Sequence, residues 1–119
     1  MPIVVVYGIP YNVSSLVLVS SLSSGIKKTV AGITKLNVLP EEVTVYFPQE
    51  MKTDGGFYGD QKGICVFVYL YDKPERIESV LLQMCQVVVE KIREFAFAKN
   101  LSVSCDPVLL NPRTSFSLP

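Results

Sequence analysis

The pattern of hydrophobic and polar residues along this chain predicts a strand, a helix and a strand, and this succession occurs twice. In the first half, a run rich in β-branched residues at Ile3–Tyr7 predicts a strand, and residues 43–47 predict a second one. Between them, apolar residues recur every three or four positions, as on one face of an amphipathic helix. These residues are Leu18, Leu22, Ile26, Val30 and Ile33. We expect this helix to begin at Ser14 or Ser15, either of which can cap its first turn, and to end near Lys35.

The second half repeats the order of strand, helix and strand. Residues 64–71 are apolar at every position, which is typical of a strand that is covered on both faces. Pro74 lies where a second helix can begin, and helical spacing then continues to about Lys99. The apolar residues with this spacing are Ile77, Leu81, Met84, Val88, Ile92 and Phe95. Residues 101–105 alternate and predict a final strand, which the Asp106-Pro107 pair is expected to end.

These patterns predict one α/β (α+β) domain over residues 1–119, made of two consecutive β-α-β units. Because β-α-β crossovers are almost always right-handed, each half is expected to pair its two strands in parallel beneath its own helix. The result is a four-stranded mixed sheet with two helices on one face. The intervening residues 48–63 contain Asp54, Gly55 and Gly56 and are expected to form a loop or small hairpin. The other face of the sheet then needs a cover, and homo-oligomerisation is the simplest one.

The charge balance and the length of the apolar runs exclude two classes of partner. The 119 residues include 11 basic and 11 acidic side chains, so the chain lacks the basic excess of a protein that neutralises phosphates. We therefore expect no nucleic-acid partner. The apolar run at residues 64–71 is far shorter than the ~20 residues of a membrane-spanning helix, and the first residues do not resemble a signal peptide. We expect no membrane partner and a cytoplasmic location.

The residue types also restrict the chemistry. Histidine is absent, which excludes Ser-His-Asp and Cys-His nucleophile systems and histidine-based zinc sites. The three cysteines, Cys65, Cys85 and Cys105, have no CxxC spacing and indicate neither a disulfide framework nor a metal site. We expect them to be buried as small hydrophobic residues in a reducing compartment. Neither a GxGxxG nor a P-loop sequence is present, so we expect no cofactor and no metal.

The first ten residues resemble a known family. They read MPIVVVYGIP, with Pro2, Gly8 and Pro10 at the positions that mark small uncharacterised bacterial members of the tautomerase superfamily. The predicted strand at residues 43–47, followed by EMKTDGGFYG, is similar to a strand and glycine-bearing hairpin of 4-oxalocrotonate tautomerase. With the repeated β-α-β plan, this resemblance covers nearly the whole chain. The superfamily also includes macrophage migration inhibitory factor.

The resemblance implies an activity and a candidate site. In the family the initiator methionine is removed, and the secondary amine of the proline, here Pro2, is the general base that isomerises a small enol or α-keto acid. An α-amino group titrates near ~8, so it can act as a base at neutral pH without a histidine. Substrate-binding positions implied for the carboxylate substrate are Lys35, Tyr46, Ser104 and Asp106. The family also implies a trimer. In such an assembly Tyr46, Arg76 and Arg113 could each line a cleft shared between subunits.

Two departures from the family pattern favour an alternative function. Thr44 occupies the position of the second-strand arginine of 4-oxalocrotonate tautomerase. Asp106 brings a negative charge to a place where a substrate carboxylate would approach. The alternative is a non-catalytic oligomeric binding or assembly module of the same fold, so whether the protein is an enzyme stays open at this stage.

A second resemblance concerns RNA-binding domains, which share the βαββαβ order of elements. Residues 62–69 read KGICVFVY and are similar to the third-strand motif of the RNA-recognition motif. However, Ile64 and Val66 occupy the positions at which aromatic rings should stack on bases. Together with the neutral charge, this substitution argues against RNA binding.

Overall fold

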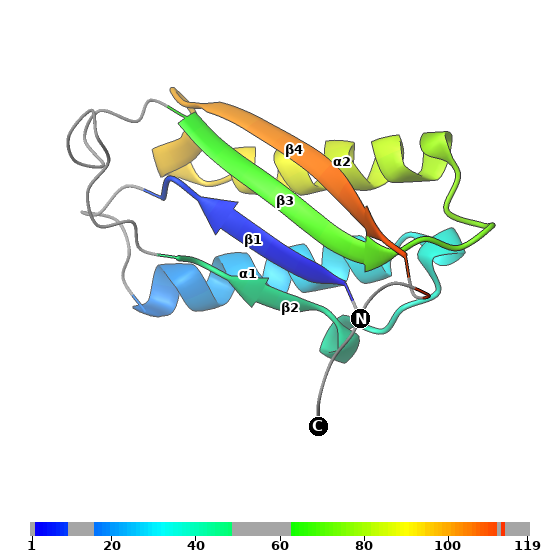
Figure 1. The fold of residues 1–119 in the computed structure, drawn as a ribbon. Helices are drawn as coiled ribbons and strands as arrows, with labels where there is room; N and C mark the ends of the chain where they lie inside the picture. The colour runs from blue at the N-terminus through cyan, green and yellow to red at the C-terminus, as the bar shows by residue number, and fades with distance from the viewer. Residues whose placement is uncertain (1, 10–15, 49–62, 112, 114–119) are drawn as a thin grey trace.

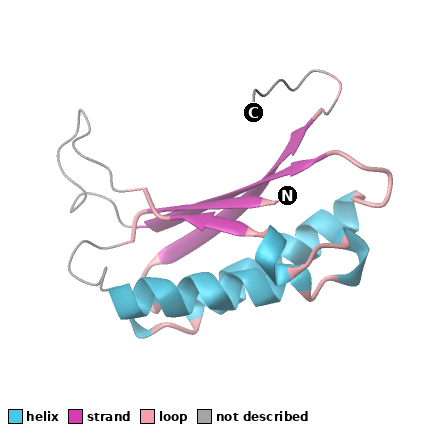
Figure 2. Cartoon of the chain, turned by 90° about the horizontal axis from the view of Figure 1, so that it is seen from below, coloured by secondary structure: helices cyan, strands magenta, loops and turns pink. Residues whose placement is uncertain are grey.

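The computed structural model describes residues 2–9, 16–48, 63–111 and 113. These residues form a sheet of four strands and two α-helices, with the helices packed on one face of the sheet (Figures 1 and 2). The predicted fold class is therefore confirmed. The capping residues Ser14 and Ser15, and all but the two ends of the predicted loop at 48–63, lie outside the described residues.

The strands are β1 (Ile3–Tyr7), β2 (Thr44–Tyr46), β3 (Gly63–Tyr71) and β4 (Ser102–Leu110), in the sheet order β2-β1-β3-β4. β1 pairs with β2 in parallel, β3 pairs with β4 in parallel, and the two central strands β1 and β3 are antiparallel. Each β-α-β unit therefore keeps its two strands as neighbours, as predicted. This arrangement differs from the split β-α-β topology of ferredoxin-like domains, which supports the argument against an RNA-recognition motif.

The helices are α1 (Leu16–Ala31) and α2 (Glu78–Arg93), and both are shorter than the sequence predicted. α1 ends before Gly32, and Ile33 is already extended. α2 begins four residues after Pro74, because Pro74 lies in a turn instead. The Arg76 N–H closes this turn by donating a hydrogen bond to the Lys73 carbonyl (2.9 Å). Short 3₁₀ helices, η2 (Thr34–Leu36), η3 (Pro40–Glu42) and η5 (Ala96–Ala98), connect the elements.

The core lies between the helices and one face of the sheet. The inward-facing residues of β1 and β3 are almost completely buried, as is the apolar stripe of α1. They are Val4, Val6, Ile64, Val66, Val68, Leu70, Leu22, Ile26 and Val30. α2 adds Met84, Val88 and Ile92, each fully buried. No helix in the described part of the chain combines the length and the apolar character that a membrane crossing requires.

β4 is longer than predicted, since it continues through Asp106 and Pro107 to Leu110. The expectation that this pair ends the strand was wrong. β4 is an edge strand that pairs only with β3 in the described sheet, so a proline in it can point its ring nitrogen away from the ladder. Pro107 lies opposite Val68, and the register with β3 continues on both sides of it. The strand therefore tolerates the missing N–H.

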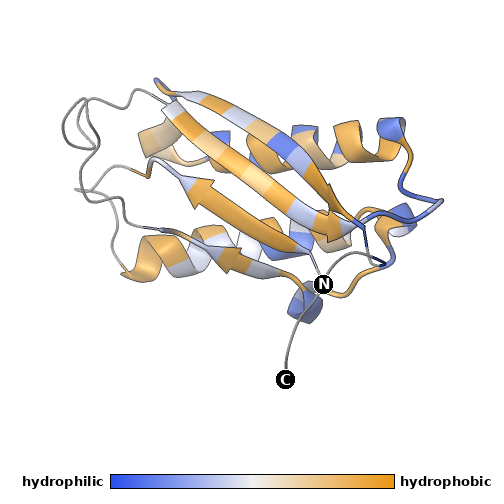
Figure 3. Cartoon of the chain, viewed as in Figure 1, coloured by the Kyte–Doolittle hydropathy of each residue, from blue (hydrophilic) through white to orange (hydrophobic). Residues whose placement is uncertain are grey.

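The sheet face turned away from the helices is apolar, and no other described element of the chain covers it (Figures 2 and 3). We call this the open sheet face. Its central residues are half-buried by their neighbours, and Tyr7 and Phe67 pack edge to face with ring centroids 6.0 Å apart. The residues on it are Ile3, Val5, Tyr7, Thr44, Tyr46, Cys65, Phe67, Tyr69, Tyr71, Ser104, Asp106, Val108 and Leu110. Asp106 is the one charged side chain among the described strands. The described elements of the chain therefore cover β3 on its helix side, and the predicted cover on its other face is not among them.

Candidate functional site

The candidate site is built around Pro2, immediately before β1. Pro2 is buried, and its carbonyl oxygen accepts a hydrogen bond from the Thr44 N–H (3.1 Å), which continues the parallel pairing with β2. Proline costs no ladder hydrogen bond at the first position of a strand. β1 is flanked by β2 on one side and β3 on the other, so the start of the strand is held from both sides. The backbone at Pro2 is therefore well fixed.

The short helix η2, which contains Lys35, lies at the end of the sheet where β1 begins and β3 ends (Figure 1). Ile3 is opposite Tyr69, so the start of β1 is next to the end of β3. A buried side chain, Arg76, ties that end of β3 to η2, which contains Lys35. The Lys35 side chain is exposed, and so is that of Arg113, whose backbone N–H donates to Asn111 Oδ1 (2.9 Å).

Arg76 is the charged residue that the described part of the chain buries, with 6% of its surface exposed. Its Nη1 donates to the Tyr71 carbonyl (2.5 Å) and its Nη2 to the Leu36 carbonyl (3.4 Å). Nε has no hydrogen-bond partner among the described residues. Burial lowers the pKa of the guanidinium, because desolvation disfavours its charge, while Glu75 acts in the opposite direction.

The other predicted site residues lie further along the sheet. Tyr46 is opposite Val5, and Val5 is opposite Phe67, whose partner on β4 is Asp106. This row of four residues is about 10 Å from Pro2 along the strand, at ~3.3 Å per residue. Tyr46 and Asp106 occupy opposite edges of the sheet, and both side chains are exposed.

Ser104 lies in a row further still from Pro2. It is opposite Cys65, which is opposite Tyr7, so this row is about 16 Å from Pro2 by the same rise. Within one chain, the structure therefore brings Lys35 to the Pro2 end and leaves Tyr46, Ser104 and Asp106 apart from it. Sequence reasoning gave Arg76 a surface role, and the missing signal was the turn at residues 73–76 that directs it inward.

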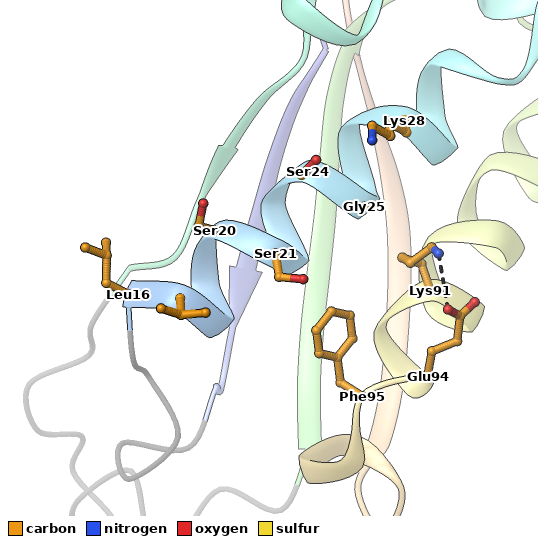
Figure 4. A pocket seen from close by; sticks show the side chains of 10 residues that line it. Leu16, Ser20, Ser21, Ser24, Gly25, Lys28, Lys91, Glu94 and Phe95 are labelled. Carbon is orange, nitrogen blue, oxygen red and sulfur yellow. Dashed lines mark hydrogen bonds and ion pairs between the residues drawn. The ribbon is translucent and has the colours of Figure 1, made fainter.

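A groove on the helical side of the molecule lies between the start of α1 and the end of α2 (Figure 4). Its floor is made of small residues, including Ser20, Ser24 and Gly25, and its walls include the exposed Leu16. Lys91 Nζ forms an ion pair with Glu94 Oε1 at 3.2 Å, which neutralises part of the positive charge in the groove. The groove contains none of the five predicted site residues.

The surroundings of the cysteines differ from the expectation of three buried residues. Cys65 is exposed, Cys85 is buried and Cys105 is intermediate. The expectation was wrong for Cys65 because β3 alternates, so that Ile64 and Val66 face the helices and Cys65 faces away. Within the described residues, no three acidic, cysteine or histidine side chains gather closely enough to hold a metal ion.

Comparisons with known proteins identify similar folds. Neither a family model nor a curated protein matches the sequence. Among solved structures, a DUF1904 protein of unknown function from Sebaldella termitidis matches with a TM-score of 0.70 and 14% identity, over 98% of this chain and 95% of that one. An asymmetric trimer of fused 4-OT matches with a TM-score of 0.69 and 15% identity, over 98% of this chain and 91% of that one. Macrophage migration inhibitory factor from Toxoplasma gondii matches with a TM-score of 0.62 and 12% identity, over 97% of this chain and 95% of that one.

These structures all have the tautomerase-superfamily fold, and this chain shares it over nearly its whole length. The resemblance that the first residues indicated is therefore confirmed as a likeness of fold, including the likeness to small uncharacterised bacterial proteins.

Proposed function

We propose that this protein is a tautomerase-like isomerase of a small enol or α-keto acid, and that the N-terminal amine of Pro2 is its general base once Met1 has been removed. The observation that carries the proposal is the buried Pro2 at the start of a central strand, in a fold shared with 4-OT. The amine would take a proton from the carbon or oxygen next to a carbonyl and return it at a conjugated position. Proline fixes φ, so the lone pair of this amine would point in one direction.

Physical chemistry supports Pro2 as the base of a chain without histidine. A free α-amino group titrates closer to neutrality than a lysine does. Burial disfavours the protonated form further, because a charged amine loses hydration in an apolar environment. A retained Met1 would instead make the Pro2 nitrogen an amide, which has no basicity. Lys35, at the same end of the sheet, is the described cation that we assign to the substrate carboxylate.

We further propose that copies of the chain assemble through the open sheet face into a trimer. This face is apolar, and it carries one charge among the described strand residues. The known structure of fused 4-OT with this fold is a trimer. Since Ser104, Asp106 and Tyr46 lie away from Pro2 within one chain, any contribution that they make to the site would come from a neighbouring subunit.

The first prediction concerns the Pro2 amine. An α-keto acid with a conjugated triple bond adds covalently to a nucleophilic amine, so we expect it to label the peptide that begins with Pro2 in the mature protein. Intact mass and peptide mapping measure the adduct. Isomerisation of enol-keto pairs, followed by ultraviolet absorbance, measures the activity. We expect labelling and loss of activity to proceed at the same rate.

The matched control is a chain with an uncleaved residue before Pro2, which keeps every side chain and converts the Pro2 amine into an amide. We expect this variant to fold as the parent does, to carry no label on Pro2 and to lose the isomerase activity. Full activity in this variant, or in Pro2→Ala, would contradict the proposed base.

The second prediction concerns assembly. We expect multi-angle light scattering to give an oligomer at micromolar concentration, and Phe67→Glu to produce a folded monomer, because it places a charge at the centre of the open sheet face. Leu82→Glu, on the outer surface of α2 where the leucine is 57% exposed, should leave the oligomer intact. A monomeric parent protein would contradict the proposed assembly.

The non-catalytic alternative is favoured by Asp106, whose exposed carboxylate lies on the open sheet face without a described cation on the same strands. Such a charge repels a substrate carboxylate. A protein with a free Pro2 amine that binds keto acids without turning them over would support this alternative.

A further inference from the structure

Two of the three cysteines, Cys85 and Cys105, line the same pocket between α2 and β4. Cys85 lies on the buried side of α2 with 7% of its surface exposed, and it belongs to the core. Cys105 lies on β4 opposite the fully buried Val66, so its side chain is on the helix side of the sheet, where it packs against the same core. Within this shallow pocket, each thiol has the largest influence on the pKa of the other. A disulfide bridge needs two thiols that approach each other from their separate elements, and a shared pocket places these two on facing elements.

The pair is also accessible to a small reagent. Cys85 and Cys105 both line a shallow pocket between α2 and β4. The other residues around it are Leu82, Gln86, Val89 and Glu90. This pocket is on the helix side of the sheet, away from Cys65 and from the open sheet face. An assembly through the open sheet face would therefore leave it free.

We propose that Cys85 and Cys105 form a redox-active dithiol, which a small-molecule disulfide oxidises reversibly to a bridge between α2 and β4. The inference does not depend on the proposed isomerase activity, because it involves neither Pro2 nor the open sheet face.

The reaction is a pair of thiol–disulfide exchanges. The Cys85 thiolate attacks one sulfur of the reagent, forms a mixed disulfide and expels a thiolate, which takes up the proton that Cys85 lost. Cys105 then gives up its proton and attacks the Cys85 sulfur, so that the protein disulfide forms and the second thiol of the reagent leaves. Two protein thiols are oxidised, and one small-molecule disulfide is reduced to two thiols.

The electrostatics of the pair support this order of attack. A hydrogen bond from the Cys105 thiol lowers the pKa of Cys85, against the opposing effects of burial and of the charge on Asp106. The same hydrogen bond and burial raise the pKa of Cys105, which therefore keeps its proton until Cys85 has reacted.

The test is to incubate the reduced, folded protein with oxidised glutathione and to measure its intact mass. We expect a loss of mass equal to two hydrogen atoms, which reducing agent reverses. Non-reducing trypsin digestion should then link the peptide of residues 77–91, which contains Cys85, to that of residues 100–113, which contains Cys105. In urea at the same glutathione ratio, we expect the bridged fraction to fall at least ~10-fold, because unfolding removes the high effective concentration of the partner thiol.

Variants separate the roles of the three cysteines. Cys65→Ser should form the bridge as the parent does, whereas Cys105→Ser should stop at a glutathione adduct on Cys85. The peptide map that identifies the bridge is made on the parent protein. A folding defect in a variant therefore cannot affect that result. Bridges to Cys65, glutathione adducts without a bridge, or an equal bridged fraction in urea would each overturn the proposal.

Discussion

Leu22→Ala is expected to lower the free energy of unfolding by about 3–4 kcal/mol, a typical loss for a leucine that is removed from a well-packed core. Leu22 lies on the inward stripe of α1 with 1% of its surface exposed, and it contacts the cluster formed by the helices and the sheet. The truncation removes transfer free energy and leaves a cavity that rigid β-branched neighbours on β1 and β3 fill poorly. Urea denaturation at a fixed protein concentration measures the change.

Leu16→Ala is the matched control, since it makes the same chemical change in the same helix at a residue that is 85% exposed. We expect it to change the free energy of unfolding by no more than about 0.5 kcal/mol. Equal losses for the two variants would contradict the inward orientation of the stripe on α1.

Arg76→Met is expected to lower the free energy of unfolding by about 2–4 kcal/mol, because it leaves two backbone carbonyls without the donors that satisfy them. Those carbonyls belong to Tyr71 and Leu36, so the side chain connects the second β-α-β unit to the first. Methionine retains most of the apolar stem, so packing should change less than hydrogen bonding does. Urea denaturation again measures the effect.

Arg93→Met is the matched control, since Arg93 Nη1 also donates to a backbone carbonyl, that of Leu101 (3.3 Å), but at an exposed position. Water can replace this donor, so we expect a loss below about 1 kcal/mol. An unchanged or increased stability of Arg76→Met would show that desolvation of the buried guanidinium outweighs its two hydrogen bonds.

The periodicity of the sequence was sufficient for the elements and their order. The run Ile3–Tyr7 and the repeated stripe of α1 are local patterns, and each element formed where its pattern indicated. The handedness of β-α-β crossovers then determined the parallel pairs. The ends of the elements were less predictable, because a proline such as Pro74 can begin a helix or occupy a turn. In the structure it occupies a turn, which the hydrogen bond from the Arg76 N–H to the Lys73 carbonyl stabilises.

The candidate site was predictable to a smaller extent. Pro2 was identified from the resemblance of the first residues to a family, and its burial next to β2 is consistent with that interpretation. The relation of Pro2 to Ser104 and Asp106 depends on the register between β1, β3 and β4, which the pattern of each strand does not encode.

The amino-acid sequence alone determined the two β-α-β units, the balanced charge, the absence of histidine and the excess of apolar residues. Those properties follow from composition and from periodicities of two and 3.6 residues, which are local. Only the tertiary structure decided that Arg76 is buried, that Cys65 faces away from the helices and that Cys85 and Cys105 line the same pocket. Each of these facts depends on how distant segments pack, because side chains that share a pocket are brought together by the register of the strands and the placement of the helices on them.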